Sequence, residues 1–98
     1  MFSFPDNVGP KPITFYLDEN GTQNVAPPSG SHFEITGDQP NVATVVVGGN
    51  PQQAIVTPVA SGVVHVTCKL IAADSSVIVQ DTEAINYTPS YSLRAVMV

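Results

Sequence analysis

Turn-forming residues interrupt this chain too often to leave room for helices of ordinary length. Clusters of Pro, Gly, Asn and Asp recur about every 8–12 residues, and no segment between them shows a sustained helical repeat. The intervening runs are rich in Val, Ile and Thr, which together make up 29 of the 98 residues. Because β-branched side chains are stiff and pack well on a pleated surface, the chain is expected to be all-β.

The clearest expected strand is residues 63–71. Its apolar residues Val64, Val66, Cys68 and Leu70 alternate with polar ones, which is the pattern of a strand with one buried face. The same reasoning predicts strands at residues 13–17, 22–25, 31–36, 42–47, 53–58 and 77–88. About seven short strands separated by turns predict an antiparallel β-sandwich.

A chain of this length is expected to form one domain. We expect residues 1–12 to form an extended arm, residues 13–89 the sandwich, and residues 90–98 an apolar tail. The alternation of apolar residues along the expected strands predicts the core. The predicted core residues are Phe33, Ile35, Val45, Val56, Val64, Val66, Cys68, Leu70, Ile85 and Tyr87.

The composition excludes several classes of function. Only three residues are Lys or Arg and the net charge is −5, so the basic surface that binds nucleic acid or an anionic membrane is missing. No apolar run approaches the ~18 residues of a membrane helix, and no secretory signal is recognised. Only 11% of the residues are charged, against about 25% in an ordinary domain. Such a surface is weakly protected against self-association and suits an assembly.

Three adjoining stretches resemble the bacterial immunoglobulin-like domains of the group 2 type. Residues 40–45 (PNVATV) resemble one strand of that family, residues 54–62 (AIVTPVASG) its next strand and corner, and residues 62–68 (GVVHVTC) the strand after that. Phe33 is expected to fill the volume of the tryptophan that the family usually carries. The resemblance implies an immunoglobulin-like sandwich, a fold that serves as a spacer, an adhesion unit or a phage virion decoration.

No catalytic, cofactor or metal site is predicted. His32 and His65 fall on the outward faces of their expected strands, where a solvated histidine is expected rather than a metal ligand. Cys68 falls on the inward face, is the only cysteine, and is expected to be a small buried apolar residue. Asp18, Glu19 and Asp38 are better explained by turns than by a calcium site. The chain is therefore expected not to be an enzyme.

Apolar residues outside the expected sandwich gather at both ends of the chain. They either pack on their own domain, where they cover an exposed edge of a sheet, or dock on a neighbouring subunit, for example by strand addition. The predicted partner-binding residues are Phe2, Phe4, Tyr91, Leu93, Val96 and Met97, with Met1 and Val98 beside them.

These observations predict a non-catalytic structural module of a phage virion, either a capsid decoration or cement protein or a minor structural protein. Its expected partners are protein subunits of a larger assembly, such as the major capsid protein, or further copies of itself; no cofactor, nucleic acid or membrane is expected. The alternative is an adhesion or carbohydrate-binding module, extracellular or at the bacterial cell surface. Tyr16, Tyr87 and Tyr91 would then supply the stacking surface for a glycan.

Overall fold

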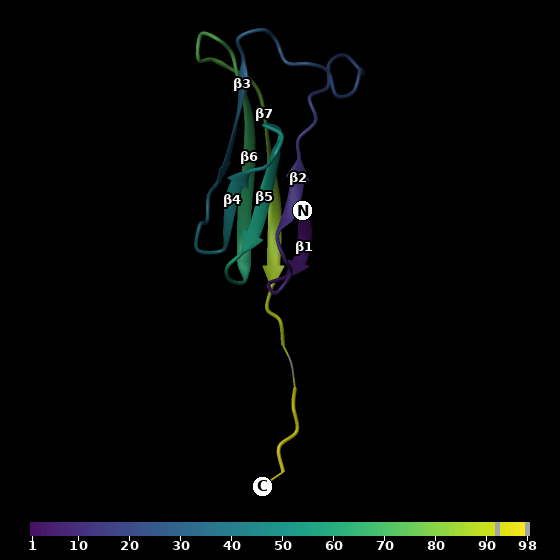
Figure 1. The fold of residues 1–98 in the computed structure, drawn as a ribbon, viewed down its shortest axis with the longest axis vertical. Helices are drawn as coiled ribbons and strands as arrows, with labels where there is room; N and C mark the ends of the chain where they lie inside the picture. The colour runs from purple at the N-terminus through teal and green to yellow at the C-terminus, as the bar shows by residue number, and fades with distance from the viewer. Residues whose placement is uncertain (92, 98) are drawn as a thin grey trace.

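The computed structural model describes residues 1–91 and 93–97; the predicted tail residue Val98 lies outside them. The described residues form two β-sheets and no helix. This arrangement confirms the expected all-β class and is consistent with a β-sandwich (Figure 1). The strands are β1 (Phe2–Pro5), β2 (Lys11–Thr14), β3 (His32–Gly37), β4 (Ala43–Val47), β5 (Gln53–Pro58), β6 (Gly62–Ile71) and β7 (Val77–Thr88).

One sheet has the strand order β1-β7-β6-β3 and the other has the order β2-β5-β4. All pairs are antiparallel except β1 with β7, which run parallel with Phe4 opposite Tyr87. The expectation of a purely antiparallel sandwich is therefore wrong for the first sheet. Parallel neighbours need a long connection between them, and here that connection is almost the whole domain.

The strand predicted at residues 22–25 is absent from the structure, and the one predicted at residues 13–17 is displaced, since β2 spans Lys11–Thr14. Pro12 lies inside this strand, which is possible because β2 is at the edge of its sheet and an edge strand can leave one side unpaired. After Thr14 the chain stays beside β5 for one more residue, since the Phe15 N–H donates to the Gln52 carbonyl over 2.9 Å. Beyond that point it moves away from the sheet.

The core lies between the two sheets and is built mainly on β6. Val64 and Val66 are fully buried, and Cys68 and Leu70 are nearly so. Among the other predicted core residues, Val56, Ile85 and Tyr87 are buried, whereas Phe33, Ile35 and Val45 are half-buried and pack against the buried cluster. Phe15 and Ala43 also belong to this cluster.

The two ends of the chain differ sharply. Residues 2–5 lie in the first sheet as β1, and the Phe4 ring packs 6.5 Å from the Tyr87 ring, measured between centroids. The segment after β7, by contrast, leaves the sandwich and continues away from it in the direction in which β7 runs (Figure 1). It gives the structure its elongated extents of 69 × 25 × 21 Å.

Candidate functional site

A cleft opens in the domain because β1 is much shorter than β7. β1 pairs only with residues 85–88 of β7. Along residues 77–84, no other strand of the described chain covers the side of β7 that faces away from β6. A cleft of about 380 Å³ opens there, between β7 and the chain that follows β2.

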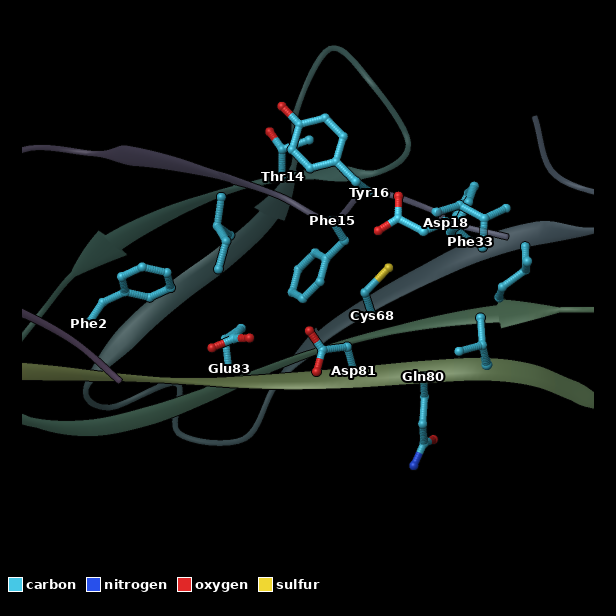
Figure 2. A pocket seen from close by; sticks show the side chains of 14 residues that line it. Phe2, Thr14, Phe15, Tyr16, Asp18, Phe33, Cys68, Gln80, Asp81 and Glu83 are labelled. Atoms are coloured by element: carbon cyan, nitrogen blue, oxygen red, sulfur yellow. The ribbon is translucent and has the colours of Figure 1, made fainter. Parts of the chain in front are cut away.

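Aromatic and aliphatic side chains form the floor of this cleft. Phe15 comes from the segment after β2, Phe33 from β3, and Cys68 and Leu70 from β6. In Figure 2, Phe15 points toward Cys68 and Asp81. The cleft therefore gives access to one end of the apolar core.

Three carboxylates stand at the cleft, and no basic side chain lines it among the described residues. Asp81 and Glu83 lie on β7 opposite Cys68 and Val66, so they share the inward face of the sheet. Figure 2 shows both on the side of β7 nearer Phe15, whereas Gln80 points away. The third, Asp18, comes from the segment after β2. An apolar floor with an acidic rim suits an apolar ligand that carries a positive charge.

Cys68 is chemically quiet in this setting. Burial raises the pKa of its thiol, and the negative charge of nearby Asp81 raises it further. A nucleophilic cysteine needs the opposite, a pKa lowered by positive charge or by an adjacent base. The thiol is therefore protonated at neutral pH.

The two histidines lie on outward faces and each contacts one carboxylate. His32 Nε2 is 3.3 Å from Glu34 Oε1, and His65 Nδ1 is 2.9 Å from Asp38 Oδ2. Across the described residues, no group of three or more His, Cys, Asp or Glu side chains is arranged to hold a metal ion. In the same part of the chain, no helix has the length and apolarity needed to span a membrane.

The structure separates the predicted partner-binding residues into two groups. Phe4 is half-buried on its own domain, with the Lys11 ammonium 5.3 Å from the centroid of its ring. Phe2 is half exposed and lines the cleft. The tail residues are all highly exposed: Tyr91 by 89%, Leu93 by 102%, Val96 by 67% and Met97 by 99%.

The sequence-based predictions did not include the cleft, and of its carboxylates they considered only Asp18, which was assigned to a turn. A signal for them was present, because the alternation that places Ile85 and Tyr87 in the core places Asp81 and Glu83 on the same face. Charged residues at inward positions mark an opening or an exposed edge of a sheet rather than a closed core.

No protein-family model, no curated protein and no solved structure was found to match this chain. The resemblance to group 2 immunoglobulin-like domains therefore stays a prediction. The features of the structure that bear on function are the cleft, the open edge of β7 and the exposed tail.

Proposed function

We propose that this chain is a non-catalytic structural module that binds neighbouring protein subunits through its sandwich edge and its terminal segments. The observation that carries the proposal is the tail, residues 89–91 and 93–97, where Tyr91, Leu93 and Met97 are almost fully in solvent. Exposed apolar side chains gathered in one place are typical of interaction sites. The protonated Cys68 thiol fits a structural role better than a catalytic one.

We further propose that the sandwich is immunoglobulin-like. When the strands are lettered A to G in chain order, β2-β5-β4 corresponds to B-E-D and β3-β6-β7 to C-F-G, the two groupings of that fold. The difference lies in the first strand, which pairs with β7 instead of β2. This strand order supports the proposed kinship with group 2 domains, as do the motif-like residues 40–45 and 54–68.

The proposed setting is a phage virion, with the chain as a capsid decoration, cement or minor structural protein. Two features support it: the low proportion of charged residues, at 11%, and the small domain with a protruding apolar segment (Figure 1). Both suit a protein held in many copies on a regular surface, where repeated weak contacts sum to strong attachment. The major capsid protein and further copies of this chain are the proposed partners.

The test is to isolate the native assembly from producing cells on a density gradient and identify its neighbours by cross-linking and mass spectrometry. We expect the chain to sediment with virus-like particles and to cross-link to a capsid subunit. Recovery solely as a 10.3 kDa species, with no particle protein attached, would refute the virion setting.

A second candidate, a carbohydrate-binding or adhesion module at the cell surface, is favoured by one observation. Tyr16 is 67% exposed and lines the cleft together with the carboxylate of Asp18. An exposed aromatic ring beside hydrogen-bonding groups is a suitable surface for a sugar. Binding on a glycan array that is lost in Tyr16→Ala, and retained in Tyr91→Ala, would favour this function over the first.

A further inference from the structure

The tail has the sequence pattern of a β-strand, although it pairs with nothing in the described structure. From residue 90 to residue 95, the apolar residues Tyr91, Leu93 and Ala95 alternate with Ser90, Ser92 and Arg94, and Val96 and Met97 then continue as an apolar end. A repeat of two residues with one apolar side is the signature of a strand that buries one face. The tail is thus suited in sequence to a sheet that its own domain does not provide.

The tail cannot easily reach the open edge of its own β7. Ser90 is fixed at the base of the domain, because its N–H and its hydroxyl both donate to Asp6 Oδ1, over 3.1 and 2.7 Å. The nearest part of β7, residues 85–88, is already paired with β1. From this anchor the tail points away from the sandwich (Figure 1).

A second copy offers an edge of the right length, direction and chemistry. Eight residues of β7, 77–84, span about 26 Å, and eight extended residues of the tail span the same distance. A copy placed end to end below the first, in the same orientation, receives the tail parallel to its own β7. That is the direction in which β1 already pairs with β7. The added strand would therefore lie in line with β1 along the same edge of β7.

The side chains on the two partners also match. Along the edge, Val77, Ile78 and Val79 are about half exposed, and the cleft beside them has an apolar floor with an acidic rim of Asp18, Asp81 and Glu83. The tail brings apolar side chains, and Arg94 is its only charged residue. Since Arg94 alternates with Leu93 and Ala95, it lies on the opposite face of the tail, so the match at the cleft is one of apolar side chains.

We infer that the tail of one copy adds as a parallel strand to residues 77–84 of β7 in the next copy, with its apolar face in the cleft between the sheets. The contact joins two different surfaces, so it repeats head to tail and builds a row of copies instead of a closed pair. This inference deepens the proposed assembly function and rests on it, since it names the partner and the two surfaces that meet.

Disulfide trapping in the full-length chain tests the inference. Leu93→Cys protein and Val79→Cys protein are mixed under mild oxidation, each also carrying Cys68→Ala, because Cys68 lines the same cleft as Val79. The control mixture pairs Leu93→Cys with Val46→Cys, since Val46 is also exposed but lies on β4, an edge strand of the other sheet. We expect the 93–79 heterodimer at least tenfold in excess of the 93–46 heterodimer.

Two further changes check the chemistry of the contact. Leu93→Asp should abolish concentration-dependent growth of the particle size, whereas Arg94→Ser, on the opposite face of the tail, should leave it largely intact. Equal trapping at positions 79 and 46, or no trapping at either, would overturn the inference. The proposed virion setting is judged separately by sedimentation with particles, so the two ideas can fail independently.

Discussion

The backbone N–H of His65 donates a hydrogen bond to Asp38 Oδ1 over 2.7 Å, and the His65 ring Nδ1 lies 2.9 Å from Oδ2 of the same carboxylate. In return, the Asp38 N–H donates to the His65 carbonyl over 3.2 Å. These contacts tie the loop after β3 to the middle of β6. The loop leads directly into β4, so the pair helps to position one sheet against the other.

This pair predicts a pH dependence of stability in acid. The backbone hydrogen bond from His65 is the main cause that lowers the pKa of the Asp38 carboxyl, and the side-chain contact adds to it. Because the pKa is lower in the folded state than in the unfolded state, the stabilisation is complete above the ordinary pKa of about 4 and is lost as the pH falls below it.

Asp38→Asn should therefore flatten the dependence of unfolding free energy on pH between about 4 and 2. Urea titrations at a series of pH values would measure it. High salt should reduce the difference in unfolding free energy between variant and wild type, since the Asp38–His65 pair is half exposed to solvent. A variant whose acid profile overlays that of wild type would contradict the assignment.

Gly62 is predicted not to tolerate a larger side chain. It begins β6 with φ of 139°, and a Cβ there would lie 2.9 Å from Val42 Cγ2. Gly62→Ala should destabilise the fold by about 1–3 kcal/mol through backbone strain and this contact. Gly49→Ala is the matched control, because a Cβ there meets nothing within 4 Å, and its effect should stay within about 0.5 kcal/mol. Thermal melts of both variants would measure the two losses of stability, and equal losses would contradict the prediction.

The contrast between core and tail can be measured with one substitution at two leucines. Leu70 is 2% exposed in the core, whereas Leu93 is fully exposed in the tail. Leu70→Ala should cost about 2–5 kcal/mol of unfolding free energy, and Leu93→Ala in dilute solution should cost less than about 0.5 kcal/mol. Similar losses for both, measured by denaturant titration, would mean that the tail packs on its own domain.

Cys68 should resist alkylation in the folded protein. Its thiol is buried and its pKa is raised by burial and by Asp81, so little thiolate is exposed to a reagent. In the Leu93→Cys variant, a thiol reagent at pH 8 should label one cysteine quickly and the second far more slowly. Fast labelling of both thiols in native protein would contradict the buried, protonated state.

Local pattern predicted the strands well where neighbouring residues alone decide the structure. Residues 64–70 alternate so regularly that their inward and outward faces could be assigned from the sequence, and the structure agrees. The strand at residues 53–58 was also predicted with its observed bounds, because a Gly-rich turn and a proline bracket it. In both cases the signal is contained within a few consecutive residues.

Pairing between distant residues could not be predicted in the same way. β1 has four residues, too few to show a period, and its partner β7 lies about 80 positions later. The cleft arises from the difference in length between these two strands. For the same reason Asp81 and Glu83 were missed as site residues, although their inward position follows from the alternation along β7.

The central claim, that the tail joins this domain to a neighbouring subunit, is tested most directly by sedimentation velocity on the purified full-length chain. Its concentration should be raised from micromolar to millimolar. We predict species at multiples of the 10.3 kDa monomer that grow with concentration and disappear in Leu93→Asp. A single monomeric species at every concentration, indistinguishable from that variant, would contradict the claim.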